Sequence, residues 1–357
     1  MNMMNKVRTV LTIVGLVTLL SGCSGETNAN EDEQRQAATT ALITDTNGVD
    51  DRSFNQSAWE GMVEWGKEND LEQGNEGYQY FQSSNEADYI PNIDQALNAG
   101  FKTIFGIGFQ LKDAIEEEAM NNPDNNFVMV DEVIKGADNV TSATFQSNQA
   151  AYLAGIAASY TTKTNVVGFI GGVQVSLIES FDAGFQQGVK DGAEALGKDI
   201  KIINQYAGAF DAPDKGRTIA QGIYGQDADI IYAAAGATGN GMFQEAKSLN
   251  ETSDEKEKVW VIGVDRDQEE EGNYTKGDEK ANFTLTSTLK EVGSVVNDLA
   301  TKANKDDFPG GEHIVYGLEE DAVGLTDGNL SDEAKQAVKE AREKIIAEEI
   351  KVDNTLN

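Results

Sequence analysis

One short stretch, TDTNGVDDRSFNQSAWEG at residues 44–61, carries the residue types best suited to chemistry. A β-branched run ends just before Asp45, and a turn-rich segment then leads into a helix that we expect to be capped near Ser53 or Asn55. The helix start offers unpaired backbone N–H donors, Asp45 and Asn55 offer polar groups, and Phe54 offers a flat face for stacking. The stretch is suited to a small polar ligand. On composition alone, a capped loop with Phe54 in the core fits equally well.

Three other motifs carry weaker signals. The glycine-rich segments at 168–172 and 236–241 lack the spacing of a P-loop or a dinucleotide-binding turn, so no nucleotide enzyme is indicated. The acidic run at 265–272 has its glycine at the eighth position, not the sixth of an EF-hand loop, which favours a solvated loop over a calcium site. His313, the single histidine, is more typical of a surface or strand position than of a catalytic base. We therefore expect no catalytic residue, no metal site and no cofactor.

The elements that must position these residues alternate between β and α patterns from Thr39 onward. This alternation predicts parallel strands joined by crossover helices, which is an α/β fold. It restarts after a helix candidate at 148–161, which favours two similar lobes over one eight-unit barrel. The predicted strands are 39–44, 78–81, 103–108, 126–131, 165–172, 199–207, 228–236, 258–265 and 282–288, and the predicted helices are 57–68, 89–98, 111–119, 148–161, 289–304 and 332–349.

Composition excludes several classes of function. The 357 residues carry 28 Lys plus Arg against 61 Asp plus Glu, a formal charge of −33. Such a chain would repel a phosphate backbone, so nucleic acid is excluded as a general partner. One Cys and one His cannot build a disulfide framework, a zinc site or a Cys–His catalytic pair. The length and a hydrophobic fraction of 39% suffice for about two domain cores.

The N-terminus predicts a lipoprotein signal at residues 1–22. Lys6 and Arg8 precede the apolar run 10–20, which is too short to span a bilayer as a helix. The run ends in LSGC, which resembles the lipobox of bacterial lipoproteins, where the cysteine, here Cys23, is diacylated and becomes the first residue. Two acyl chains would hold the protein at the cell membrane without a spanning helix. Residues 23–38 are polar and acidic, and we expect a flexible tether there, outside the cytoplasm.

The stretch at 44–61 belongs to a longer pattern. It is followed by GIGFQLKDA (106–114), FVMVDE (127–132), YLAGIAA (152–158), VGFIGG (167–172), AGAFDAPDKG (207–216), AAAGATGNG (233–241) and VIGVDRDQ (261–268). Together these motifs resemble the basic membrane protein (BMP) family of lipoproteins, the purine nucleoside receptors of ABC transporters. The resemblance covers nearly the whole mature body.

This resemblance implies a fold and a set of partners. The fold is the type I periplasmic-binding-protein architecture: two doubly wound parallel-sheet lobes, joined by a three-crossing hinge, that close on a nucleoside. We accordingly expect 39–146 and 266–310 to form lobe 1, and 147–265 and 311–357 to form lobe 2. The protein would be a monomeric binding component of an importer and not an enzyme, and it would work with an ABC permease and ATPase.

The resemblance also implies which residues hold the purine base. Phe54 and Phe210 match the pair that sandwiches the ring. Asp131 matches the carboxylate that reads the base edge, and it would favour the N1–H of guanine or hypoxanthine. Asn55 can donate and accept, so it could read a ring nitrogen or a carbonyl. Asp45 would support the same edge.

The ribose contacts follow from later motifs. Asp265, at the end of the VIGVD strand, and Lys290, which we expect to begin a helix, match the acid and the base that grip the ribose hydroxyls. Gly236 would let the backbone approach the sugar closely. One departure from the family pattern is Arg52, where Lys is common.

Two other functions remain open on the sequence. The same architecture could bind another small polar ligand, such as a sugar or a signalling furanose. Clustered carboxylates around a ribose could also serve an extracellular nucleoside hydrolase. The order of preference among guanosine, inosine and adenosine is not fixed by these motifs.

Overall fold

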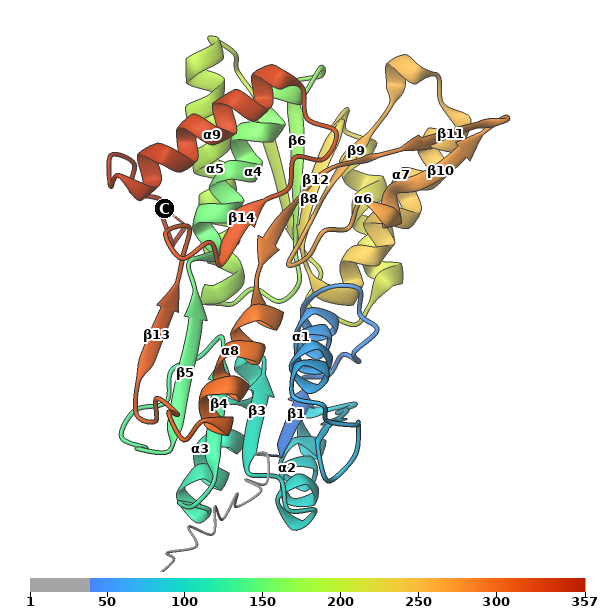
Figure 1. Cartoon of the computed structure of the whole chain (residues 1–357). Coiled ribbons are helices and arrows are strands. Elements are labelled where there is room, and N and C mark those ends of the chain that lie inside the picture. The colour runs from blue at the N-terminus through green and yellow to red at the C-terminus, as the bar shows by residue number, and fades with distance from the viewer. Residues whose placement is uncertain (1–38, 357) are drawn as a thin grey trace, which may run out of the picture. The chain divides into compact units, whose positions relative to one another are not determined.

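Two six-stranded sheets dominate the protein, whose residues 39–356 are described in a computed structural model (Figure 1). The predicted signal, Cys23 and the tether lie outside these described residues. Helices cover both faces of each sheet, and a two-stranded hairpin, β10 (Asn273–Lys276) with β11 (Glu279–Asn282), lies apart from both sheets. The α/β prediction is confirmed.

The first sheet is entirely parallel, with the strand order β13-β5-β4-β3-β1-β2. Its strand residues alternate between two apolar layers, because successive side chains of a strand point to opposite faces. Leu42 packs in the layer that contains α1 and α8, whereas Ala41 and Ile43 pack in the layer that contains α2 and α3. The elements are β1 (Thr40–Thr44), α1 (Phe54–Glu68), β2 (Tyr78–Phe81), α2 (Tyr89–Asn98), β3 (Thr103–Ile107), α3 (Lys112–Asn121), β4 (Asn126–Val130), β5 (Val140–Phe145), α8 (Val292–Asn304) and β13 (His313–Tyr316).

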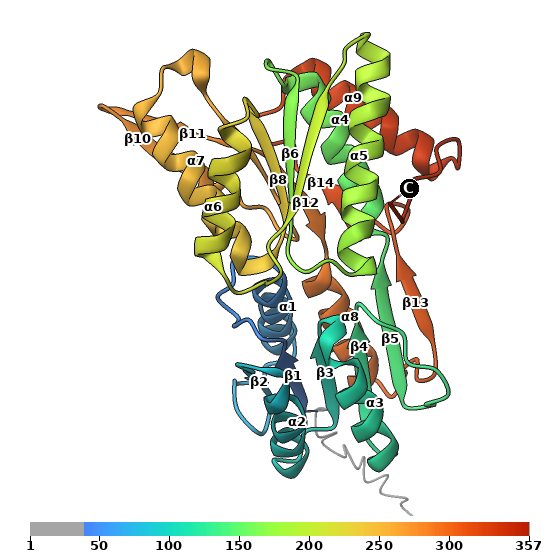
Figure 2. The same cartoon turned by 180° about the vertical axis from the view of Figure 1, so that it is seen from behind.

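The second sheet has the order β14-β12-β9-β8-β6-β7, and only β14 runs antiparallel to its neighbour (Figure 2). Phe169 packs in the layer that contains α4 and α5, and Ile170 packs in the layer that contains α6 and α7. The elements are α4 (Ser147–Thr161), β6 (Val166–Gly171), α5 (Ser176–Leu196), β7 (Lys201–Tyr206), α6 (Pro213–Tyr224), β8 (Ile230–Ala234), α7 (Asn240–Thr252), β9 (Trp260–Gly263), β12 (Thr284–Lys290), β14 (Val323–Leu325) and α9 (Asp332–Ile346).

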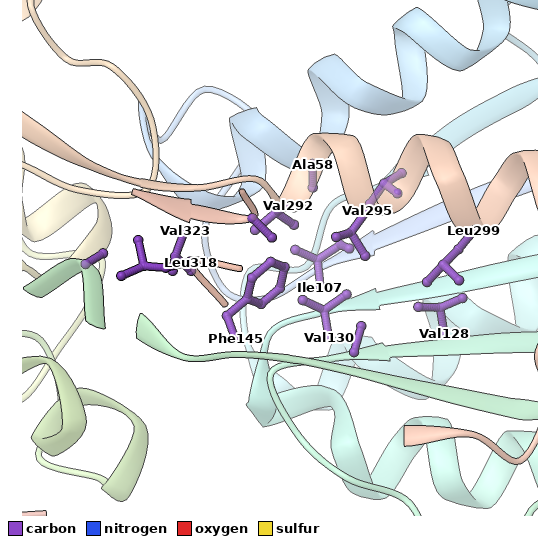
Figure 3. Packing of buried hydrophobic residues seen from close by; sticks show 14 of the residues in the cluster. Ala58, Ile107, Val128, Val130, Phe145, Val292, Val295, Leu299, Leu318 and Val323 are labelled. Carbon is purple, nitrogen blue, oxygen red and sulfur yellow. The ribbon is translucent and has the colours of Figure 1, made fainter. Parts of the chain in front are cut away.

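The chain passes between the two sheets three times, as predicted. The crossings follow β5, β12 and β13. Apolar side chains pack around them: Phe145, Leu318 and Val323 belong to the same cluster as Val292 at the start of α8 (Figure 3). Phe145 also stacks on Tyr316, with 5.4 Å between ring centroids. Below, lobe 1 means the first sheet with α1, α2, α3 and α8, and lobe 2 means the second sheet with α4 to α7 and α9.

The strand pairings differ from the predicted division at two places. Residues 266–310 were assigned to lobe 1, but β12 within them pairs with β9 of the second sheet. Residues 311–357 were assigned to lobe 2, but β13 pairs with β5 of the first sheet. Both strands lie directly before a crossing, where sequence periodicity does not indicate which sheet a strand joins. That the two lobes move separately stays a prediction.

Several element boundaries also differ from the prediction. The helix expected from 289 begins at Val292, so Lys290 is the last residue of β12 and does not begin a helix. The acidic segment after Asp265 contains the β10–β11 hairpin, and the last helix ends at Ile346, not 349. The sequence did not predict the buried strand β5, the half-exposed strand β13 or the three-residue strand β14, and it did not predict helices α5, α6 and α7.

Candidate functional site

A pocket lies where strand ends of the two lobes face one another. Strands β1, β3 and β4 of the first sheet and β7, β8, β9 and β12 of the second all end at or near it. Ligands of open α/β sheets collect at such carboxyl ends. All eight residues predicted to contact a ligand are in its lining: Asp45, Phe54, Asn55, Asp131, Phe210, Gly236, Asp265 and Lys290. Their contacts with a ligand remain a prediction.

The start of α1 is capped by Asp51, which the sequence analysis did not select. Its carboxylate accepts hydrogen bonds from the backbone N–H groups of Ser53 (2.8 Å), Asn55 (3.0 Å) and Gln56 (3.1 Å). The helix begins where predicted, with Ser53 at the N-cap position, but the Ser53 side chain makes no cap hydrogen bond and the Asp51 carboxylate takes that role. The cap fixes the first turn of α1, from which Phe54 and Asn55 reach the pocket.

Asp45 lies under this turn and is almost fully buried. Its Oδ1 accepts from the backbone N–H of Asn47 at 2.8 Å and from the side-chain amide of Asn55 at 2.9 Å. Burial raises the pKa of Asp45 to about 6, although the hydrogen bonds from Asn47 and Asn55 oppose this rise. The carboxylate therefore titrates near neutral pH.

The ion pair between Lys290 and Asp131 connects the two lobes. The Lys290 ammonium lies 2.5 Å from Asp131 Oδ2, and both side chains are 4% exposed. Asp131 follows β4 in a left-handed conformation with φ of 71°, which Asp tolerates better than most residues. The ammonium also lies 4.6 Å from the centre of the Phe54 ring and 5.0 Å from that of Phe145. Lys290 is thus held by a charge and two aromatic faces.

Asp265 is the second acid of the pocket with a displaced pKa, and it is partly exposed. Its Oδ2 accepts a hydrogen bond from Ser53 Oγ of the opposite lobe at 2.5 Å. Burial raises its pKa to about 6, while the Lys290 charge and the Ser53 hydrogen bond act in the opposite direction. Like Asp131, it has a positive φ, 67°. Such backbone conformations are concentrated at functional sites.

Lobe 2 supplies an aromatic wall. The Phe210 ring lies against Gly172, where a Cβ atom would come within 2.2 Å of the ring, so no other residue fits there without movement. Phe109 of lobe 1 meets Phe210 edge-on with 6.2 Å between centroids. Gly236 has φ of 54°, which accounts for glycine at this position. Phe54 and Phe210 therefore line the pocket from opposite lobes.

Three consecutive residues of lobe 1 are hydrogen-bonded to lobe 2 beside the pocket. The carbonyl of Asp51 accepts from Asn240 Nδ2 at 3.3 Å, and the carbonyl of Arg52 accepts from Gln268 Nε2 at 2.8 Å. Ser53 makes the third contact, to Asp265. Gln268 is 3% exposed, and its Oε1 accepts from the backbone N–H of Val264, so its side chain is fixed at both ends.

Other pocket residues were missed by the sequence analysis. Asp51 and Asn47 lie within the selected motif, and Phe109 directly follows a predicted strand, so the rule of carboxyl strand ends could have found them. The apolar residues of α5 gave no such signal, because only the fold brings that helix to the pocket. The missed lining residues include Asn47, Asp51, Phe109, Leu177, Ile178 and Phe181.

Metal clusters and membrane-spanning helices are both absent from the described part of the chain. Within residues 39–356, no group of three or more His, Cys, Asp or Glu side chains is arranged to hold a metal ion. Over the same residues, no helix is both long and apolar enough to cross a membrane. His313 lies on β13, with its Nε2 2.8 Å from Thr144 Oγ1, and is not part of the pocket lining.

Comparison with known structures places the fold. A solute-binding protein of an ABC transporter system from Aeropyrum pernix K1 has a TM-score of 0.76 at 23% identity, over 89% of this chain and 94% of that one. A second, from Conexibacter woesei DSM 14684, has a TM-score of 0.67 at 20% identity, over 90% and 100% of the two chains. The predicted type I periplasmic-binding-protein fold is confirmed.

Comparison with known sequences places the family. The ABC transporter nucleoside-binding protein BmpA of Lactococcus lactis subsp. cremoris (strain MG1363) is 49% identical over 94% of this chain and 95% of its own. Basic membrane protein A of Borreliella burgdorferi (strain ATCC 35210 / DSM 4680 / CIP 102532 / B31) is 31% identical over 97% and 95%. The profile of the Bmp family, described as "ABC transporter substrate-binding protein PnrA-like", matches residues 38–355. The chain therefore belongs to the Bmp family of ABC transporter substrate-binding proteins.

Proposed function

We propose that this protein captures purine nucleosides in the pocket between its lobes and delivers them to an ABC importer. The observation that carries the proposal is the position of Phe54 and Phe210, two aromatic rings that line one pocket from opposite lobes beside buried carboxylates and a lysine. A flat heterocycle with two exposed faces and a polyhydroxyl substituent matches such a lining. The name of the lactococcal relative, a nucleoside-binding protein, supports the same ligand class.

In this proposal the base stacks between Phe54 and Phe210. Stacking of a base on an aromatic side chain contributes about 1–3 kcal/mol. Asp131 Oδ1 is buried and has no hydrogen-bond partner within residues 39–356, so it can accept an N–H of the base edge. An unpaired buried acceptor disfavours any ligand that leaves it without a donor.

The ribose then lies toward Asp265, Lys290 and Gly236. A carboxylate accepts from vicinal hydroxyl groups, and an ammonium donates to the same oxygens, so the pair suits a nucleoside better than a free base. A phosphate at the 5′ position would lie near the Asp265 carboxylate, and the repulsion between the two negative charges disfavours nucleotides. We do not propose that Asp265 or Lys290 catalyses a reaction.

Binding is coupled to closure of the two lobes. A ligand that touches both lobes favours the closed arrangement by its additional contacts there. The division into two moving lobes, hinged at the three crossings, is part of this proposal, as is recognition of the closed monomer by a permease and its ATPase.

The protein would act outside the cytoplasm, anchored by lipid on Cys23 after removal of residues 1–22. This part of the proposal rests on the LSGC motif. Globomycin, which blocks lipoprotein signal cleavage, should leave the larger precursor in treated cells. An unchanged mature mass would contradict lipid anchoring.

A thermal-shift panel tests the ligand class. Ligands that bind the native state raise Tm. Guanosine, inosine or adenosine should raise Tm, whereas ribose, sugars and nucleoside phosphates should not. A shift with sugars alone would indicate a different polar ligand, and release of hypoxanthine from inosine would indicate a hydrolase. Either result would contradict the proposal.

A further inference from the structure

The side-chain amide of Asn55 is held by two carboxylates. Asn55 is fully buried, and its Nδ2 donates to Asp45 Oδ1 at 2.9 Å and to Asp51 Oδ2 at 3.0 Å. An ionised carboxylate only accepts hydrogen bonds, and an amide nitrogen has two hydrogens to donate. Both hydrogens of the Asn55 side chain are thus directed at acids and away from a ligand.

The amide cannot be turned over at low cost. The reversed orientation would place the Asn55 oxygen against two carboxylate oxygens, with no hydrogen between any of them. Neither acid can move aside easily, because Asp51 is held by the backbone N–H groups of the first turn of α1 and Asp45 by Asn47. The hydrogen-bond network therefore determines which end of the amide faces the pocket.

The end of the amide that stays unpaired is the oxygen. Asn55 Oδ1 is buried, and no hydrogen-bond partner for it is found within residues 39–356. Asn55 is also part of the pocket lining. A buried carbonyl oxygen without a donor costs free energy, so a ligand that supplies an N–H gains affinity over one that does not.

We propose that Asp51 is a positioning residue that fixes Asn55 as a hydrogen-bond acceptor, so that the protein selects purine nucleosides whose base presents an N–H donor to Asn55. This inference rests on the function proposed above and narrows it. The sequence left Asn55 free to donate or accept, whereas the network leaves only the acceptor. Guanosine carries two donor groups on its base, N1–H and a 2-amino group, so it can supply both Asn55 and the unpaired Asp131 Oδ1. Inosine and adenosine carry one donor group each, and purine riboside, which has no N–H on its base, should be discriminated against most strongly.

The test compares guanosine with purine riboside by calorimetric titration of the full chain. The wild type should bind guanosine at least about tenfold more tightly, because purine riboside leaves the buried acceptors Asn55 Oδ1 and Asp131 Oδ1 unpaired. Asp51→Asn removes one of the two carboxylates that disfavour the reversed orientation of the Asn55 amide. The amide can then turn and donate an N–H to a ring nitrogen of purine riboside. The ratio should then fall to about threefold or less. An amide oxygen in place of Asp51 Oδ1 can still accept from the backbone N–H groups of Ser53 and Gln56, so the first turn of α1 keeps two of its three hydrogen bonds to residue 51.

A matched control separates positioning from folding. Asp88→Asn changes another carboxylate that accepts backbone N–H groups at the start of a helical segment, outside the pocket lining. It should leave the ratio of the two affinities unchanged. Equal binding of the two nucleosides by the wild type would overturn the inference. So would an Asp51→Asn variant that loses affinity for both ligands by the same factor, since that is the behaviour of a purely structural residue.

Failure of the proposed function would give a different result, namely no binding of any nucleoside by the wild type. The amide orientation can then be tested without a ligand by NMR of asparagine-labelled protein, with Asn55→Ser used to assign the signals. Asp51→Asn should shift one of the two Asn55 side-chain proton resonances strongly, because that proton loses a charged acceptor. Two unshifted resonances would overturn the inference.

Discussion

The two walls of the pocket are built differently. The lobe 1 wall comes largely from one continuous segment, in which Asp45, Asp51 and Asn55 hydrogen-bond to one another and to nearby backbone. The lobe 2 wall is assembled from separate loops. Phe210, Gly236 and Asp265 follow three different strands, and Asp265 takes its hydrogen bond from Ser53 of the other lobe.

The two walls therefore differ in how far they are preorganised for a ligand. The lobe 1 network is local, so it keeps its geometry wherever lobe 2 lies. On the lobe 2 wall, Phe210 is supported by its own lobe through Gly172, but Asp265 gains the Ser53 contact only when the lobes meet. Substitutions in the two walls should therefore affect stability, affinity and closure in different proportions.

The largest effect should come from Lys290, which joins the walls. Lys290→Met leaves Asp131 as a buried charge without its cation, and breaking such a pair typically costs about 3–5 kcal/mol of unfolding free energy. Chemical denaturation measures this loss. The double variant Asp131→Leu/Lys290→Met removes both charges and should recover much of the stability. If the single and double variants were equally unstable, the ion pair would not be the cause.

Phe54→Ala should weaken nucleoside binding more than it weakens the fold. Loss of one stacking face corresponds to about 1–3 kcal/mol, or roughly 5- to 150-fold in Kd, which calorimetry can measure. Phe81→Ala is the matched control, because Phe81 packs in the α2–α3 layer and does not line the pocket. It should lower Tm and leave Kd unchanged. Near-native affinity of Phe54→Ala would contradict the sandwich.

Affinity should fall as the pH drops through about 6. The pKa of Asp265 is raised to about 6 by burial, so its carboxylate form is complete above that pH and is lost below it. Because ligand hydroxyls donate to the carboxylate, binding lowers this pKa and is favoured at high pH. At pH 5 about a tenth of Asp265 is ionised, which predicts about a tenfold loss relative to pH 7.5.

Asp265→Asn serves as the control for this titration. It should bind weakly at every pH and lose most of the dependence attributed to Asp265, leaving the dependence due to Asp45, whose pKa is also raised to about 6. A wild-type affinity that stays constant between pH 7.5 and 5 would show that neither carboxylate contributes as an acceptor.

The smallest effect on affinity should come from the Gln268 hydrogen bond that joins the two lobes. Gln268→Glu keeps the oxygen that accepts from Val264 but replaces the donor to the Arg52 carbonyl with an acceptor. We expect about a threefold loss of affinity and a larger radius of gyration by small-angle scattering without nucleoside, with wild-type dimensions at saturation. Identical scattering of the two proteins without nucleoside would mean that this contact does not hold the lobes together.

The sequence predicted the pocket residues better than it predicted the chain's path between the lobes. Asp45, Asp131 and Asp265 all follow strongly apolar, buried strands. Local pattern pointed to Asp45, whereas the resemblance to the family pointed to Asp131 and Asp265. Strand β13 is short and half-exposed, and nothing in HIVY indicates that it joins the first sheet. The pairing of Lys290 with Asp131 joins residues 159 positions apart, so no local pattern could reveal it.

The interactions around Asn55 also depend on contacts that a local sequence pattern cannot reveal. Its position beside Phe54 was visible in the motif, but the direction of its amide depends on where the Asp45 and Asp51 carboxylates lie in space. Ser53 also occupies the predicted N-cap position of α1, but its hydroxyl donates to Asp265 in the other lobe and makes no cap hydrogen bond. Tertiary hydrogen bonds decided both outcomes.

Calorimetric titration of inosine into the wild type and into Phe54→Ala/Phe210→Ala tests the central claim most directly. We expect one saturable site in the wild type and no measurable binding to the variant, whose pocket has lost both stacking faces. Unchanged inosine affinity in the double variant, or no binding by the wild type, would contradict a nucleoside held between the two lobes.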